Sequence, residues 1–133
     1  MTDFLPNALK ALEKAEDAIE TAKYDLKGGF ETAAVNRGYY AMFYYMTALL
    51  ILHNVHTKTH QGIQAKFREL YIKNGVFDIA ISEQLQAAFN LRQQVDYDLD
   101  TRVDAEDVQR LITAAEEFYA LTKSHLKAIN DQA

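Results

Sequence analysis

The apolar positions of this chain recur at intervals of three and four residues along most of its length, and strand-like alternation is almost absent. That spacing places apolar side chains along one face of an α-helix. A single Pro and only five Gly interrupt the pattern, so long helices are the natural expectation. The pattern therefore predicts an all-α protein.

Start and stop signals divide the pattern into five predicted helices. Pro6 suits the first turn of a helix, whereas Gly28–Gly29 and Asn74–Gly75 can supply the left-handed residue that ends one. Asp104 can cap the last helix with its carboxylate. The predicted ranges are 6–27, 31–53, 59–73, 78–94 (or 82–94) and 104 to the C-terminus.

Each predicted helix carries an apolar stripe, and the second has apolar residues on so many sides that it must be covered all round. It is therefore the predicted central element of an up-and-down bundle that forms a single domain over residues 1–133. The predicted core positions are Leu9, Leu12, Ile19, Leu26, Val35, Tyr39, Met42, Met46, Leu49, Ile63, Phe67, Leu70, Ile81, Leu85, Ala88, Leu91, Val108, Leu111, Ala115, Phe118, Thr122 and Leu126.

Composition narrows the classes of function. With 19 acids against 14 bases the net charge is −5, so no overall basic field draws the chain to nucleic acid or an anionic membrane, and any RNA contact must be local. The absence of Cys excludes disulfides and thiolate catalysis and fits a cytoplasmic location. No secretion signal is visible at the N-terminus.

Residues 38–57 contain no Lys, Arg, Asp or Glu, over a length close to that of a membrane span. Four tyrosines, two histidines and an asparagine fall within this segment, and its continuously apolar part, residues 48–52, is short. We therefore interpret it as a buried helix, and no membrane association is expected.

Two patterns imitate metal sites. The acids after residue 95 follow the spacing of a calcium-binding loop, but its sixth position is Thr101 instead of Gly, so a capped polar loop between helices is the favoured interpretation. Three histidines could share a helix face and hold zinc. A helix end at Asn54 and a new cap at Thr59 would separate them, so no metal and no cofactor are expected. The calcium-like acids are Asp96, Asp98, Asp100, Asp104 and Asp107, and the histidines are His53, His56 and His60.

Two polar groups lie on otherwise apolar helices. Arg37, Tyr40 and Tyr44 share one face, and Arg92 is followed one turn later by Asp96 and then by Tyr97. A guanidinium near the core needs an acid, so these groups are expected to meet inside the bundle. The meeting point is either a structural network or a cleft in which arginine holds a phosphate and tyrosine stacks on a base.

Three segments of the sequence resemble the small prokaryotic HEPN domains (higher eukaryotes and prokaryotes nucleotide-binding). They are AAVNRGYYAMFYYMTALL, KTHQGI and LRQQVDYD, and the similarity extends over about residues 31–119. The resemblance implies an up-and-down helical bundle that forms homodimers. It also implies a nucleotide or RNA ligand and a minimal nucleotidyltransferase partner, within a toxin–antitoxin or defence system.

Several branches of the family are metal-independent ribonucleases with an Arg-x(4–6)-His motif. Its arginine corresponds to Arg92, but Tyr97, Asp98 and Leu99 occupy the positions of the histidine. Tyrosine and aspartate do not titrate near neutrality without a strong shift. His60 is a candidate to reach the site from another helix.

Three hypotheses follow for the function of the chain. The first is a binding module, with Arg92, Asp96 and Tyr97 as the catalytic-type residues and Arg37, Tyr40, Tyr44 and His60 as ligand-binding residues. The second is a ribonuclease with an altered motif, and the third is a purely structural bundle. In a pair with a nucleotidyltransferase, Tyr97 is the expected site of nucleotide attachment.

Overall fold

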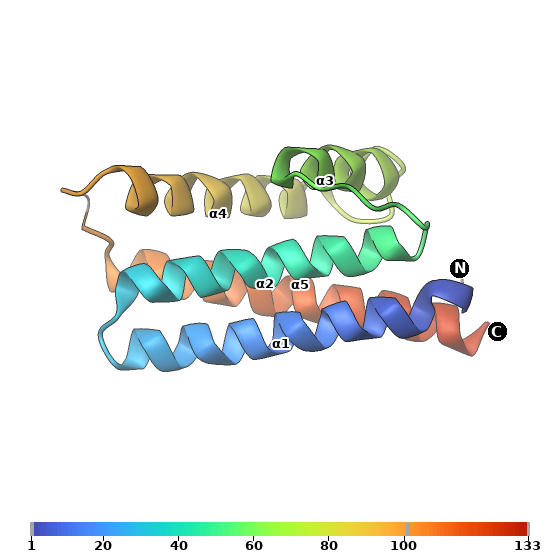
Figure 1. Cartoon of the computed structure of the whole chain (residues 1–133), viewed down its shortest axis with the longest axis horizontal. Coiled ribbons are helices and arrows are strands. Elements are labelled where there is room, and N and C mark those ends of the chain that lie inside the picture. The colour runs from blue at the N-terminus through green and yellow to red at the C-terminus, as the bar shows by residue number, and fades with distance from the viewer. Residues whose placement is uncertain (1, 101, 133) are drawn as a thin grey trace.

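Helix α2 (Glu31–Ile51) is the element around which the other helices pack. The structure is a computed structural model that describes residues 2–100 and 102–132. In Figure 1, α1, α2 and α5 run side by side, α3 and α4 form a second layer over α2, and both termini lie at one end. The other elements are η1 (Thr2–Phe4), α1 (Leu5–Lys27), α3 (His60–Phe67), the π-helical turn η2 (Arg68–Ile72), α4 (Ile79–Tyr97) and α5 (Ala105–Asp131).

The predicted all-α bundle is confirmed, and most helix ends lie where the capping residues placed them. Gly29 and Gly75 have positive φ angles of 83° and 73° after α1 and η2. The side chains of Thr59, Asp78 and Asp104 accept backbone N–H groups at the starts of α3, α4 and α5. None of the helices in the described ranges has the length and apolar content needed to cross a bilayer.

Two helices differ from the prediction. The segment predicted as one helix over 59–73 changes after Phe67 into the π-helical turn η2, which the apolar spacing does not reveal. Helix α4 continues to Tyr97, three residues beyond its predicted end, because no Gly or Pro follows Gln94 to stop it. The extra turn carries Asp96 on the helix and fixes its distance from Arg92.

The core contains most of the predicted apolar positions, and α2 lies at its centre. Val35, Met42 and Leu49 are almost fully buried. The prediction was wrong for Leu9, which is 44% exposed. Helix α1 instead buries a row of alanines spaced by three and four residues, which allows its backbone to lie close to its neighbours. These alanines are Ala8, Ala11, Ala15, Ala18 and Ala22.

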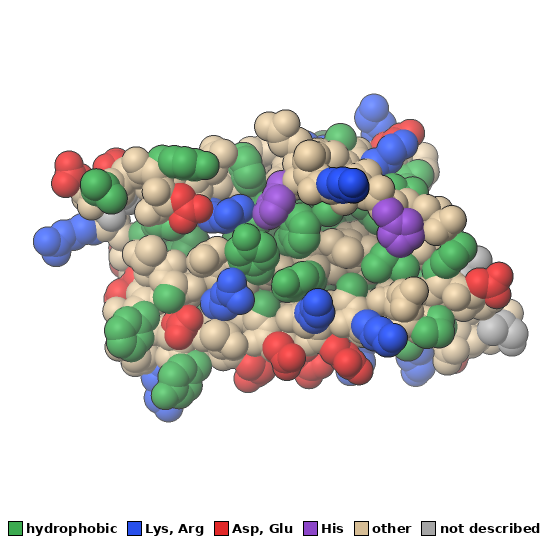
Figure 2. Space-filling view, in the orientation of Figure 1, with side chains coloured by type: hydrophobic (Ala, Val, Ile, Leu, Met, Phe, Trp, Pro, Cys, Tyr) green, Lys and Arg blue, Asp and Glu red, His purple; other side chains and the backbone are tan. Residues whose placement is uncertain are grey.

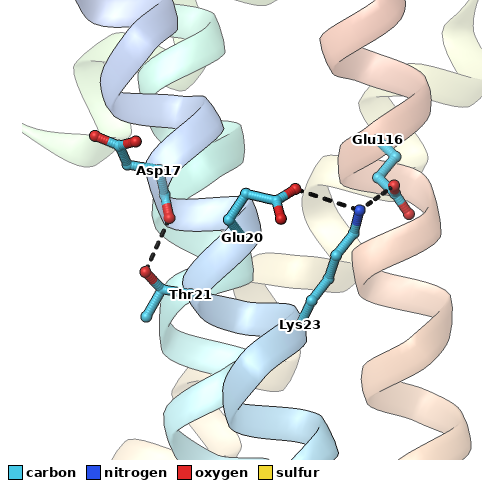
Figure 3. Close-up of polar contacts among 5 residues, drawn as sticks. All are labelled: Asp17, Glu20, Thr21, Lys23 and Glu116. Atoms are coloured by element: carbon cyan, nitrogen blue, oxygen red, sulfur yellow. Dashed lines mark hydrogen bonds and ion pairs between the residues drawn. The ribbon is translucent and has the colours of Figure 1, made fainter.

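Helices α1 and α5 are also joined at their surfaces by Lys23. Its Nζ lies 2.7 Å from a carboxylate oxygen of Glu116 on α5 and 3.4 Å from one of Glu20 (Figure 3). The hydrogen bond to Glu116 raises the pKa of Lys23. Since the lysine side chain is 41% exposed, solvent screening leaves such a pair worth at most about 1 kcal/mol.

A second polar group lies in the core and includes Tyr71 of η2. Tyr71 stacks on Phe67 and Phe77, with ring centroids 5.6 and 5.5 Å away. Its hydroxyl donates to the Leu49 carbonyl oxygen at 3.0 Å. The hydroxyl has one proton, so the Nε2–H of His53, 3.1 Å away, is the donor to the phenol oxygen. The π-helical turn is thus tied to the end of α2.

His125 of α5 packs edge-on against Tyr71, at a centroid distance of 5.5 Å. Its Nε2 is buried and has no hydrogen-bond partner in the described part of the chain. Burial lowers the pKa values of both His53 and His125, and the positive charge of His53 lowers the pKa of His125 further. The folded protein therefore binds fewer protons than the unfolded chain just below pH 6.5.

Stability is accordingly predicted to be fully present above the unfolded pKa of about 6.5 and to fall as the pH drops through the lowered folded values. Urea unfolding followed by circular dichroism between about pH 7.5 and 5.5 measures this slope. His125→Phe keeps the aromatic contact with Tyr71 and should flatten it. His56→Gln, at an exposed position, is the control; equal slopes for wild type and H125F would contradict the account.

Candidate functional site

The candidate site lies where the end of α4 meets α2, and the ring of Tyr39 is its floor. Tyr39 is 1% exposed. The Cζ atom of Arg92 lies 4.8 Å from the centre of this ring and 5.2 Å from that of Tyr40. These distances permit cation–π attraction to both rings, so the two tyrosines hold the guanidinium at the surface of the core.

Asp96 is the acidic partner of this guanidinium. Its Oδ2 lies 3.2 Å from Arg92 Nε, with the arginine side chain 23% and the aspartate side chain 38% exposed. The approach lacks hydrogen-bond geometry, and Nε is buried without a hydrogen-bond partner in the described residues. Asp96 thus balances the charge of Arg92 but leaves part of its donor capacity unused.

Arg37 brings a second guanidinium to the same place. Its Cζ lies 5.1 Å from the centre of the Tyr40 ring, so both arginines contact one aromatic side chain. Within residues 2–100 and 102–132, no carboxylate forms an ion pair with Arg37. Of the two guanidinium groups, that of Arg92 alone is paired with a carboxylate in the described residues, and the site carries a local positive charge on an acidic protein.

His60 completes the cluster from a third helix. The Thr59 hydroxyl caps α3 by accepting the N–H of Gly62 at 2.9 Å, which makes His60 the first helical residue. Its Nδ1 lies 2.7 Å from the Tyr39 hydroxyl oxygen, and its ring lies 4.3 Å from that of Phe43. The imidazole is therefore held by a hydrogen bond and by ring packing.

The surroundings shift the pKa values of this pair. Burial raises the pKa of the Tyr39 phenol, while hydrogen bonding to Gln64 and the positive charge of Arg92 act against that rise. Burial, and then the charge of Arg92, lower the pKa of His60. Near pH 7 the phenol is protonated and the imidazole is neutral, so neither adds a charge to the two guanidinium groups.

The surface over the candidate site carries both charged and hydrophobic side chains. Figure 2 shows a histidine next to a basic side chain, surrounded by hydrophobic side chains, between α2 and the layer of α3 and α4. A row of acidic side chains follows the edge formed by α1, and others lie at the two ends of the molecule and beside the basic side chain.

The structure brings together most of the residues predicted from the sequence. Arg37, Tyr40, Arg92, Asp96 and His60 form one cluster. Tyr44 extends it, with its ring 6.3 Å from that of Tyr40 and 6.0 Å from the ammonium of Lys14.

Tyr97 does not join the cluster, contrary to expectation. Its side chain is 83% exposed. A residue one turn beyond Arg92 lies on the same helix face, as Asp96 does, but Tyr97 is five positions beyond and points elsewhere. Besides Tyr40, the ring that contacts the guanidinium is that of Tyr39, which was predicted only as a core residue. The pair of adjacent tyrosines at positions 39 and 40 was the available signal.

The residues that imitated metal sites have other partners. Asp104 caps α5 and Asp98 accepts the N–H of Asp100, while Thr101 lies outside the described residues. His53, His56 and His60 bond to Tyr71, Asn54 and Tyr39 respectively, and the predicted separation of the three is confirmed. In the part of the chain that the structure describes, no three His, Asp or Glu side chains are grouped as metal ligands.

A groove of about 740 Å³ runs between α4 and α5. Apolar side chains contribute much of its lining, among them Ala87, Leu91 and Ala114, and polar groups such as Gln94 and Glu117 also line it. Arg37, Arg92, Asp96 and His60 are not among its lining residues. The groove is a separate surface feature from the arginine cluster.

Comparison with known proteins agrees with the resemblance seen in the sequence. A model of the HEPN domain matches residues 8–125. Two proteins of Methanocaldococcus jannaschii, each named "Putative toxin", are 33% and 30% identical over 92% and 89% of this chain, and each match covers 87% of the relative. A protein of Thermotoga maritima named UPF0332 protein is 31% identical over 79% of this chain and 80% of its own length.

The geometry predicts effects of different size on stability at Arg92 and Tyr97. Arg92→Ala removes the cover of two tyrosine rings and leaves Asp96 unpaired, and should lower the free energy of unfolding by about 1–2 kcal/mol. Tyr97→Ala removes an exposed side chain and should change it by less than about 0.5 kcal/mol. Urea unfolding of both variants measures the difference. A larger loss for Y97A than for R92A would contradict the described site.

Proposed function

Since the chain belongs to the HEPN domain family, we propose that it is a toxin-type member that binds RNA at the cluster of Arg37, Tyr40 and Arg92. The observation that carries the proposal is the imbalance of charge: two guanidinium groups contact one tyrosine ring, and one carboxylate pairs with only one of them. A phosphodiester supplies the missing negative charge and the acceptor atoms that Arg92 lacks.

The aromatic side chains beside the arginines suit the rest of an RNA ligand. Tyr40, Phe43 and Tyr44 are neighbours on one face of α2 and are only partly buried. Nucleobases stack on such rings with little dependence on sequence. Helix α3 also starts at His60, and the positive end of a helix favours an anion nearby. A free nucleotide shares the phosphate chemistry and is the simpler alternative ligand.

A toxin role is supported by the names of the two archaeal relatives. A toxin that acts on RNA works in the cytoplasm, which agrees with the absence of Cys. The proposed binding is local, because the net charge of −5 gives no general attraction to polyanions. Affinity should therefore depend on very few basic residues.

Fluorescence anisotropy with a 5′-labelled single-stranded RNA tests the binding. Arg92→Gln and Arg37→Gln should each weaken binding at least about tenfold and reduce its salt dependence, since each removes a phosphate contact. Arg110→Gln is the matched control, because Arg110 is exposed and pairs with Asp107 and Glu106 on its own helix. Equal affinity for wild type, R37Q and R92Q would refute the proposal.

We further propose that the chain forms a homodimer and pairs with a minimal nucleotidyltransferase. The groove between α4 and α5 supports the homodimer, because it offers an apolar lining with polar groups around it.

The exposure of Tyr97 supports the pairing with a nucleotidyltransferase. Its side chain is 83% exposed and lies at the end of α4, where a partner enzyme can reach it. Attachment of a nucleotide there would place new negative charge close to the arginine cluster.

Co-expression with a nucleotidyltransferase encoded beside this chain tests this arrangement. Mass spectrometry of the purified complex should find the mass of an added nucleotide on the peptide that contains Tyr97, and sedimentation should give two copies of this chain. Tyr97→Phe, which keeps the ring, should remain unmodified. An unmodified wild-type chain from the active pair, or modification that persists in Y97F, would count against Tyr97 as the target.

A further inference from the structure

We infer that Lys14 and Tyr44 form a second nucleotide subsite, in which the tyrosine ring stacks on a base and the ammonium group pairs with the next phosphate of the strand. The inference rests on the proposed binding of RNA at Arg37, Tyr40 and Arg92, and extends that binding along α2 and onto α1. The ligand of the whole surface is then an oligonucleotide, whereas a free nucleotide fills only the first part of it.

The second subsite adjoins the arginine cluster on the same face of α2. Tyr44 lies one helical turn after Tyr40, and the centres of the two rings are 6.3 Å apart. Both rings are only partly buried. Tyr45, the next residue, is fully buried and packs on Phe118 of α5, because neighbouring positions of a helix point to different faces. A strand that leaves the arginine cluster along α2 therefore meets Tyr44 next.

Lys14 brings another basic group to this surface from α1. Its Nζ lies 6.0 Å from the centre of the Tyr44 ring, at the outer limit of cation–π attraction. Among the described residues, carboxylates form ion pairs with Lys23 and Lys66 but not with Lys14. The lysine is exposed, and its flexible stem can move the ammonium group from the ring to a phosphate when a base stacks there.

Basic side chains follow the boundary between α1 and α2. In Figure 2 a row of them lies between the hydrophobic side chains over the candidate site and the acidic row along α1. A phosphate backbone that runs beside α2 from Arg37 toward Tyr44 therefore stays next to positive charge. Contacts of this kind bind a strand without reading its sequence.

The spacing of the two tyrosine rings selects the form of the ligand. In a duplex, successive nucleotides of one strand rise by about 3.4 Å and their bases stay stacked. The rings of Tyr40 and Tyr44 are 6.3 Å apart and inclined at 37° to each other, so bases that each stack on one ring cannot also stack on one another. The strand must be one whose bases are free to separate, which a duplex does not supply.

Two substitutions in the full chain test the two contacts separately. Lys14→Gln should weaken binding of a single-stranded RNA octamer about three- to tenfold and reduce the slope of log K against log salt by about 0.7, as expected for one lost phosphate contact. Tyr44→Leu should weaken binding at least about fivefold and leave the slope unchanged, because stacking on a base releases no counterion. Fluorescence anisotropy of the 5′-labelled octamer between about 50 and 200 mM salt measures both quantities.

Two further variants control for changes in the fold. Tyr44→Phe keeps the aromatic ring and should restore the affinity lost in Y44L. Lys123→Gln removes an exposed lysine that lies 5.8 Å from the centre of the Tyr119 ring on α5. It repeats the Lys14 substitution at a similar pair outside the site and should change neither the affinity nor the slope. Each affinity is referred to the folded fraction measured by circular dichroism.

An octamer of abasic residues isolates the stacking contact, because it keeps the phosphates and has no bases. Wild type and Y44L should bind this strand equally, whereas K14Q should still bind it more weakly. The RNA octamer annealed to its complement should bind to wild type at least about tenfold more weakly than the single strand does.

The outcomes separate this inference from the proposed function. If R37Q and R92Q weaken binding of the octamer but neither K14Q nor Y44L does, the second subsite is refuted and the arginine cluster remains the site. Weaker binding of the abasic strand by Y44L than by wild type, or equal binding of duplex and single strand, refutes stacking at Tyr44. Failure of wild type to bind the octamer refutes both proposals. A loss in K14Q with the reduced slope, together with a loss in Y44L that requires the bases, supports the inference.

Discussion

The contact between the Arg92 guanidinium and the rings of Tyr39 and Tyr40 is the interaction on which the site depends. Helix α2 is covered on nearly all sides, so a charge beside it must be held by groups that offset its lost hydration. The two rings and Asp96 do this in part. Arg37 lies nearby, and within the described residues no carboxylate forms an ion pair with it. The proposal that the cluster binds an anion rests on this imbalance.

Local sequence signals predict much of the fold. Caps at Thr59, Asp78 and Asp104 and left-handed glycines set most helix ends correctly, because each acts within one turn of its own position. The π-helical turn η2 and the exposure of Leu9 were not predictable in this way. Both depend on how neighbouring helices pack, and the spacing of apolar residues along one helix carries no such information.

The candidate site likewise has contacts that local spacing predicts and contacts that depend on how the helices pack. The pairing of Arg92 with Asp96 follows from a spacing of one helical turn and was predicted. The bond between His60 and Tyr39 joins residues 21 positions apart on different helices, so it depends on where α3 begins relative to α2. The prediction that Tyr97 lies near Arg92 was wrong, because a residue five positions further along lies on a different face of the helix. Tyr39, whose phenol bonds to His60, was predicted only as a core residue.

The central claim is that the two guanidinium groups over Tyr40 receive the phosphate of a ligand. Nuclear magnetic resonance of the arginine Nε–H groups, during titration with the single-stranded RNA, observes those groups directly. The account predicts that the signals of Arg37 and Arg92 shift together, with one dissociation constant, while that of Arg110 stays in place. Unmoved signals from Arg37 and Arg92 at saturating ligand would contradict it.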